Sequence, residues 1–207
     1  MMKITCEKCP RLCAYINQNK LKNPDHFNAP VPPFGDDNPD LLVVGLAPGR
    51  GTNRTGRPFT GDVAGELLYP MLVKYGFATG TFEAKKDDTI VLHQCRITNA
   101  VKCVPPENKP TGEEIRTCLH LFKSELKQMP SVKWILALGG IAHEQVLRAY
   151  GLKKKDFPFV HGVVYTLPDG KKLVSSYHCS KYNTSTKRLT PESFESVFKT
   201  IKSLSDE

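Results

Sequence analysis

At residues 41–62 the chain reads LLVVGLAPGRGTNRTGRPFTGD, an apolar run followed by a loop that holds five glycines and three arginines. The apolar run is typical of a buried strand in a parallel sheet. Glycine lets the backbone approach a ligand closely, and arginine supplies a planar charged fork that suits phosphate. Phe59 adds a ring for stacking and Asp62 adds a carboxylate. A strand that ends in such a loop indicates a binding site.

Strands and helices alternate outward from this stretch. We expect strands at 41–46, 89–98, 132–138, 163–167 and 172–176, and helices after Pro10, at 63–75, 111–128, 141–150 and 191–204, with an irregular loop at 23–40. This alternation predicts an α/β fold with three layers, α/β/α, and a central, mostly parallel sheet. Pro70 predicts a kink or a break in its helix. Thr111 with Glu114, and Thr190 before Pro191, are typical of helix N-termini.

Three of the expected strands end in chemically versatile residues. The first ends in the glycine- and arginine-rich loop, the second at Asn99, and the last at Tyr177 and His178. Ligands of open α/β sheets bind beyond the carboxyl ends of the strands. We therefore expect the three ends to converge on one crevice, the alternative for each being an ordinary transition from strand to loop.

The composition fits one basic globular domain. The 207 residues suffice for a substantial core, and 29 Lys+Arg against 21 Asp+Glu give a net charge of +8. That charge favours a polyanionic partner, nucleic acid first, although it also fits a basic soluble protein without one. No apolar stretch is long enough for a transmembrane helix, and the N-terminus lacks the apolar core of a signal peptide. We expect no membrane partner and a cytoplasmic location.

Seven cysteines in a reducing compartment favour metal or cluster ligation over disulfides. Cys6 and Cys9 form a Cys-x-x-Cys pair, and Cys103 and Cys118 flank a proline-rich loop and the start of a helix. Two close and two distant thiolates can bind zinc or a four-iron cluster, and the spacing does not choose between them. Cys13 could replace one ligand or remain a free thiol.

The other two cysteines have different contexts. Cys95 lies within a strand pattern and is expected in the core. Cys179 follows His178 and is expected near the crevice. A redox role for the Cys-x-x-Cys pair is weakly supported, because no thioredoxin-like strand precedes it.

Four segments, in this order, resemble the iron–sulfur uracil-DNA glycosylases of type b, also called family 5, in the uracil-DNA glycosylase superfamily. They are residues 6–12, residues 45–62, residues 97–109 with Cys118, and residues 176–180 with Asn183 and Arg188. The resemblance covers nearly the whole chain and implies one glycosylase domain, 1–207, with a cluster-binding segment at 1–22. It implies a monomeric, monofunctional enzyme that hydrolyses the bond between uracil, or another deaminated base, and deoxyribose in DNA.

The resemblance also implies a [4Fe–4S] cluster held by Cys6, Cys9, Cys103 and Cys118. This cluster is expected to be structural, fastening loops that contact DNA. Two alternatives remain. A non-catalytic iron–sulfur protein of the same fold would bind nucleic acid without releasing a base, and a zinc-stabilised redox or interaction protein would contain zinc.

The base-binding residues that the resemblance implies are Ala47, Phe59 and Asn99. Phe59 is placed to stack on a base extruded from the helix, since a glycosylase must take its target out of the duplex. Asn99 carries an acceptor and a donor, so it can pair with N3–H and O4 of uracil, whereas cytosine presents the opposite pattern. The alternatives are a core aromatic for Phe59 and a turn residue for Asn99.

The implied catalytic residues are Asp62 and His178. A neutral His178 can donate a hydrogen bond to O2 of uracil as negative charge builds up there. Leu46 and Ala47 occupy the place where other branches carry a polar or acidic residue, so Asp62 is the candidate for positioning or activating water. Asp62 can also act as the N-cap of the next helix.

The implied DNA-binding residues are Arg54, Arg57, Asn183 and Arg188. Further candidates for phosphate contacts are Arg50, Lys102, Lys109, Lys181 and Lys187, for which a solvated surface charge is the alternative. The chain departs from the family at Cys179, where proline usually follows the histidine. That loop is less constrained as a result.

Overall fold

The apolar run at residues 41–44 lies at the centre of a six-stranded sheet in the computed structural model, which describes residues 4–203. The sheet order is β1-β5-β2-β6-β8-β7, with the bounds β1 Phe34–Gly35, β2 Leu41–Gly45, β5 Cys95–Asn99, β6 Trp134–Leu138, β7 Val164–Thr166 and β8 Lys172–Ser176. The four inner strands are parallel, and only the two edge strands β1 and β7 run antiparallel to their neighbours. The predicted mostly parallel sheet is confirmed.

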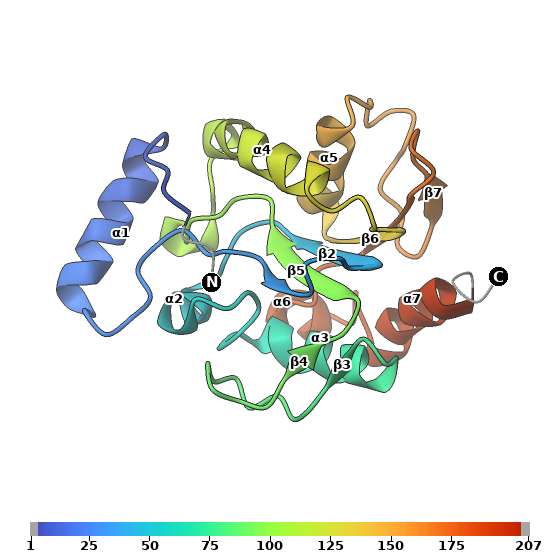
Figure 1. Ribbon diagram of the computed structural model, residues 1–207, viewed down its shortest axis with the longest axis horizontal. Coiled ribbons are helices and arrows are strands. Elements are labelled where there is room, and N and C mark those ends of the chain that lie inside the picture. The colour runs from blue at the N-terminus through green and yellow to red at the C-terminus, as the bar shows by residue number, and fades with distance from the viewer. Residues whose placement is uncertain (1–3, 204–207) are drawn as a thin grey trace.

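Helices cover both faces of this sheet (Figure 1). Helices α4 (Gly112–Lys127) and α5 (Gly140–Ala149) lie on one face, and α3 (Val63–Lys74) and α7 (Pro191–Ser203) lie on the other. Side chains alternate along a strand. Leu42 and Val44 of β2 therefore pack in the core under α4 and α5, while Leu41 and Val43 pack toward α3 and α7. Burial on both faces explains why β2 has no polar residue.

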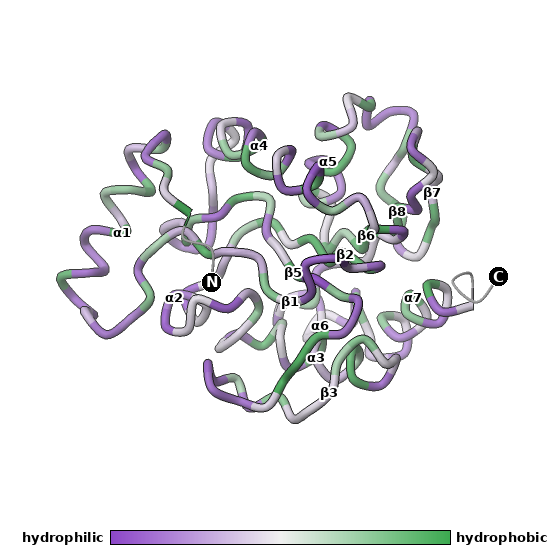
Figure 2. The backbone as a smooth tube through the Cα atoms, in the orientation of Figure 1, coloured by the Kyte–Doolittle hydropathy of each residue, from purple (hydrophilic) through white to green (hydrophobic). Residues whose placement is uncertain are grey.

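Helix α1 (Pro10–Lys22) lies beside the sheet and carries many hydrophilic residues, as Figure 2 shows. Its two buried side chains, Leu12 and Ile16, pack against Val101 and Ile115 in a third, smaller core. This core holds the segment after β5 and the start of α4 together. Among residues 4–203, no helix combines the length and the apolar character needed to cross a membrane.

Two of the sequence predictions need correction. The strand expected at 89–98 is interrupted at Gln94, which has a positive φ of 49°. Its first part, β4 (Val91–Leu92), pairs with β3 (Ala78–Thr79) in a separate two-stranded sheet, and only the second part is β5. Of the kink or break predicted at Pro70, the break does not occur, because helix α3 continues through this residue.

Three short helices formed where loops were expected, namely α2 (Arg50–Thr55), the 3₁₀ turn η1 (Pro106–Asn108) and α6 (Lys181–Ser185). The predicted helix starts are confirmed, with a full capping box between Thr111 and Glu114 and a cap from Thr190 to the backbone N–H of Ser193. The expected end of the last helix at Leu204 lies outside the described residues.

The strand register determines which strand ends lie next to one another. Gly45 at the end of β2 is level with Asn99 at the end of β5, and Leu138 of β6 is level with Ser176 of β8. The carboxyl ends of the four parallel strands therefore meet at one edge of the sheet. In an open α/β sheet this edge is where ligands bind.

Candidate active site

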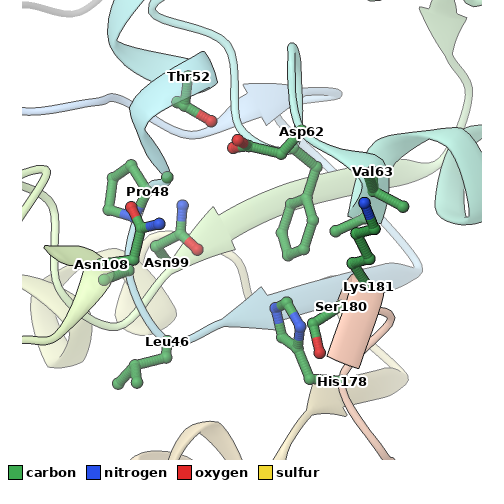
Figure 3. Close-up of a pocket in the computed structure, with 14 residues that line it drawn as sticks. Leu46, Pro48, Thr52, Asp62, Val63, Asn99, Asn108, His178, Ser180 and Lys181 are labelled. Carbon is green, nitrogen blue, oxygen red and sulfur yellow. The ribbon is translucent and has the colours of Figure 1, made fainter. Parts of the chain in front are cut away.

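A pocket of about 440 Å³ opens at this edge of the sheet. Its lining comes from residues 46–49, Thr52, Phe59, residues 62–64, Asn99, Asn108, His178 and residues 180–181. Three segments far apart in the sequence thus meet here, as the strand order requires. Figure 3 shows Asn99, Asp62 and His178 on three sides of the same space.

Phe59 forms one wall of the pocket. Its side chain is buried, and its ring stacks against the His178 imidazole with 6.0 Å between centroids. Its φ is 55°, in the left-handed region that non-glycine residues seldom adopt. Gly45 makes room for this arrangement, because a Cβ there would lie 2.7 Å from Cζ of Phe59 and 2.4 Å from Oδ1 of Asn99.

Asn99 presents an unsatisfied acceptor to the pocket. The residue is buried, and its Oδ1 has no hydrogen-bond partner among the described residues. The Oγ1 atom of buried Thr52, which also lines the pocket, is likewise unpartnered within the described chain. Leaving a buried polar atom unpaired costs stability, so these two atoms are available to bind a ligand in the pocket. Sequence reasoning missed Thr52, because it lies in the unexpected helix α2.

Asp62 reaches across the loop toward α2. It occupies the N-cap position of α3, but its side chain makes no capping hydrogen bond there and instead accepts one from the backbone N–H of Gly51 at 3.3 Å. The expected capping role is therefore wrong as regards the side chain. Burial raises the pKa of Asp62, while backbone N–H groups of Gly51 and Thr52 partly oppose this shift. Asp62 is thus a more basic carboxylate than a solvated aspartate.

His178 follows β8 and faces the pocket as a neutral imidazole. Burial lowers its pKa below the ordinary value of 6.5. No hydrogen bond of its ring nitrogens to another group forms within residues 4–203, while its backbone carbonyl accepts one from Asn183 Nδ2 at 2.8 Å. Asn183 therefore restrains the backbone of His178.

Two cations predicted to contact phosphate are buried instead. Arg57 is only 4% exposed and pairs with Asp88, so the predicted DNA contact of Arg57 is wrong. Lys102 is 1% exposed and pairs with Glu125 and with Thr98 Oγ1. Neither charge is available to a partner, since each already has a buried carboxylate.

The remaining predicted cations are exposed. Arg54 lies at the outer end of α2, and Arg188 lies 4.5 Å from the ring of Tyr177. The other exposed members of the group are Arg50, Lys109, Lys181 and Lys187, of which Lys181 lines the pocket. These cations are therefore accessible to a partner.

A second, smaller pocket is lined by five cysteines, which we call the cysteine pocket: Cys6, Cys9, Cys13, Cys103 and Cys118. It lies between the start of α1, the segment after β5 and α4. Burial raises the pKa of Cys9 to about 11 and that of Cys103 to about 12. The backbone N–H of Lys102 donates to Cys118 Sγ at 3.4 Å.

The donor set of the cysteine pocket fits a thiolate-bound metal group. Within residues 4–203, no three His, Cys, Asp or Glu side chains converge tightly enough for a single metal ion. A four-iron cluster is larger than one ion, so its ligands need not converge that closely. The two other cysteines are buried in the core: Cys95 as predicted, and Cys179 between His178 and Ser180, which both line the pocket.

Comparison with known proteins gives consistent matches. A family model described as the uracil DNA glycosylase superfamily matches residues 32–202. A protein of Thermus thermophilus named type-5 uracil-DNA glycosylase is 44% identical over 205 residues, covering 96% of this chain and 93% of that protein.

Two further relatives extend this pattern. A Mycobacterium leprae protein, also named type-5 uracil-DNA glycosylase, is 39% identical over 208 residues, covering 96% of this chain and 91% of its own. An Archaeoglobus fulgidus protein named type-4 uracil-DNA glycosylase is 33% identical over 153 residues, covering 72% of this chain and 69% of its own. The two type-5 proteins thus match nearly the whole chain.

Proposed function

The chain belongs to the uracil DNA glycosylase superfamily and to its type 5 branch, and on that premise we propose that it hydrolyses the N-glycosidic bond of uracil in DNA. It is a DNA repair enzyme that leaves an abasic site. The observation that carries this proposal at the level of residues is one pocket lined by Phe59, Asp62, Asn99 and His178. These are a stacking ring, a carboxylate, an amide and a neutral imidazole.

Asn99 is proposed to recognise the base. Its unpartnered Oδ1 would accept a hydrogen bond from N3–H of uracil, and its Nδ2 would donate to O4. Cytosine would place an acceptor and a donor against the wrong atoms of this amide. Phe59 supplies the wall on which the extruded ring would stack, and Ala47 supplies a small side chain that leaves room beside it.

Bond cleavage moves negative charge onto the leaving base. As the bond between C1′ and N1 breaks, its electron pair goes to uracil, and His178 donates a hydrogen bond to O2. A donor aimed at developing charge in a desolvated site is a strong source of rate enhancement. The lowered pKa of His178 keeps the ring neutral, so it stabilises the anion without transferring a proton.

Asp62 is proposed to direct the water. The oxygen of that water forms the new bond to C1′, and Asp62 accepts the proton that it loses. The raised pKa of Asp62 suits this task, because a general base works best when its pKa approaches the working pH. The carboxylate also faces the positive charge that develops on the sugar.

The DNA backbone would be held by exposed groups around the pocket. We assign DNA contacts to Arg54, Arg188 and Asn183, and Asn183 also positions the backbone of His178. Such contacts give affinity without sequence preference.

We further propose that Cys6, Cys9, Cys103 and Cys118 hold a [4Fe–4S] cluster. Four thiols from two distant segments line one small pocket, and a backbone N–H already points at the Cys118 sulfur. When bound, the cluster would supply a rigid cross-link rather than chemistry at the base. The whole of 1–207 then acts as one glycosylase domain, with segment 1–22 as its cluster-binding part.

The direct test is release of free base from duplexes that contain uracil, hypoxanthine or xanthine, with an unmodified duplex as the control. Uracil release with an abasic product is the expected result, and the other two bases define the breadth of the pocket. Binding of the uracil duplex without release would instead support a non-catalytic nucleic-acid-binding protein. Elemental analysis of the same preparation distinguishes iron from zinc.

A further inference from the structure

The buried ion pair between Arg57 and Asp88 has no role in the proposed chemistry, yet its geometry is that of a well-formed bidentate pair. Two parallel hydrogen bonds of 2.6 Å join Nη1 to Oδ1 and Nη2 to Oδ2. The side chains are 4% and 0% exposed. The guanidinium also lies 5.3 to 5.8 Å from three ring centroids, those of Phe34, Tyr69 and Phe82.

Asp88 is itself held by its own loop. Its carboxylate accepts hydrogen bonds from the backbone N–H of Glu83 at 3.1 Å and of Ile90 at 3.2 Å. Burial works against ionisation of Asp88, but Arg57 and these backbone donors outweigh it and keep its pKa below the ordinary value. Arg57 is therefore anchored to a fixed charge 31 residues away in the sequence.

The pair fixes the residues on both sides of Phe59. Arg57 Nε donates to Thr60 Oγ1 at 2.8 Å, and that hydroxyl donates to the carbonyl of Pro58 at 3.3 Å. The same carbonyl accepts a hydrogen bond from the Tyr69 hydroxyl at 2.7 Å. The turn that contains Phe59 is thus held at its start and at its end.

This bracing matters because Phe59 adopts an unfavourable backbone conformation. A φ of 55° in a bulky non-glycine residue persists only where the surroundings over-determine it. Without the braces, the turn can relax toward negative φ, and the ring then leaves the wall of the pocket. Gly65 leaves room for this turn, because a Cβ there would lie 1.9 Å from the Phe59 carbonyl oxygen.

We propose that Arg57, Asp88 and Thr60 form a positioning device that holds the Phe59 ring against the extruded base, a role that rests on the proposed function. None of the three is among the residues that line the pocket. Asp88 comes from a charged loop outside the pocket, so the device extends the site to residues 80–90. A merely structural pair would stabilise the protein without changing how it binds its target.

Two substitutions test the device. Asp88→Asn weakens the ion pair, and Thr60→Val keeps the pair but removes the hydroxyl that links it to Pro58. Single-turnover uracil release is measured against enzyme concentration, which separates the half-saturating concentration from the maximal rate. We expect both variants to raise the half-saturating concentration roughly tenfold, the value of one lost base-stacking contact, with a maximal rate within about twofold of the parent.

Val146→Ala is the matched control, since Val146 is buried in the core on the opposite face of the sheet. It lowers the melting temperature without touching Phe59. The proposal would be overturned if both test variants behaved like this control, with a lower melting temperature but no change in the half-saturating concentration. If Asp88→Asn does not fold, Thr60→Val decides alone.

A double variant shows whether the device acts through Phe59. In a Phe59→Leu background, Thr60→Val should add nothing to the half-saturating concentration, because effects transmitted through one group are not additive. Full additivity would place the effect elsewhere and overturn the proposal. A parent enzyme that releases no uracil would refute the proposed function instead, so the two failures are distinguishable.

Discussion

Two regions hold loops in place near the base pocket, and they do so by different means. The Phe59 loop, residues 56–62, is held by interactions within the chain, among them those of Arg57, Asp88 and Thr60. The cysteine pocket brings five thiols together, and in the proposed function a [4Fe–4S] cluster joins four of them. On that proposal the first region is complete when the chain folds, whereas the second also needs its cofactor.

This difference predicts how each region fails. Damage to the Phe59 loop should alter binding and chemistry while the metal content stays constant. Damage to the cysteine pocket should alter metal content and stability first, and activity only as a consequence. Measurements of base release, iron content and melting on the same variants therefore separate the two regions.

The largest expected effect is on chemistry at the Phe59 loop. Asp62→Asn removes the proposed base but keeps the size of the side chain, so base release should fall by roughly 10²–10⁴-fold. DNA binding, iron content and melting should stay close to the parent. Asp37→Asn is the matched control, because the Asp37 side chain is 91% exposed and does not line the pocket. Normal turnover in Asp62→Asn would remove Asp62 from the mechanism.

The next effect concerns the cysteine pocket. Cys118→Ser should abolish stable iron binding and lower the melting temperature, because one of four cluster ligands is lost. Activity should fall along with stability. The measurement is iron and acid-labile sulfide per chain, together with thermal unfolding. Cys95→Ser is the control, since Cys95 is buried outside this pocket, and it should keep its iron. Iron retained in Cys118→Ser would remove Cys118 from the ligand set.

The two buried cations, Arg57 and Lys102, show which features of the site can be predicted from the sequence and which cannot. The strand ends at Gly45, Asn99 and Ser176 follow from local apolar runs and from the rule that parallel strands share a carboxyl edge. Arg57 in a glycine-rich loop looks like a phosphate ligand, because its partner Asp88 is 31 positions away in a charged surface loop. Lys102 likewise has a partner distant in the sequence, Glu125 in helix α4, 23 positions away.

Local propensity also misled in places. Helix α2 contains Gly51 and Asn53, which are poor helix formers, so tertiary contacts outweigh propensity there. Thr52 was missed together with that helix. The break at Gln94 depends on β4 joining a different sheet, and no local pattern encodes that choice.

The pH dependence of base release also distinguishes the two regions, because the titrating group is expected to lie in the base pocket and not in the cysteine pocket. Burial raises the pKa of Asp62, and the carboxylate is the active form. The rate of base release should therefore fall as the pH drops through this raised pKa, at a higher pH than for a solvated aspartate. The residual activity of Asp62→Asn should lack that acid limb. His178 should contribute no limb near 6.5, because burial lowers its pKa.

A pH profile of single-turnover rates checks this assignment. The outcome that would contradict it is an acid limb that persists in Asp62→Asn and disappears in His178→Gln. That pattern would make His178, rather than Asp62, the titrating group. Iron content measured across the same pH range shows that the cysteine pocket is not the source of the change.

The smallest expected effect separates the fifth thiol from the other four. Cys13 lies one helical turn after Cys9, and its Sγ is 4.0 Å from the carbonyl oxygen of Cys6. If Cys6, Cys9, Cys103 and Cys118 hold the cluster, Cys13→Ser should keep the iron and the melting temperature of the parent, whereas Cys6→Ser should lose iron. The reverse result would assign Cys13, in place of Cys6, to the ligand set. Such an outcome would anchor the cluster on helix α1.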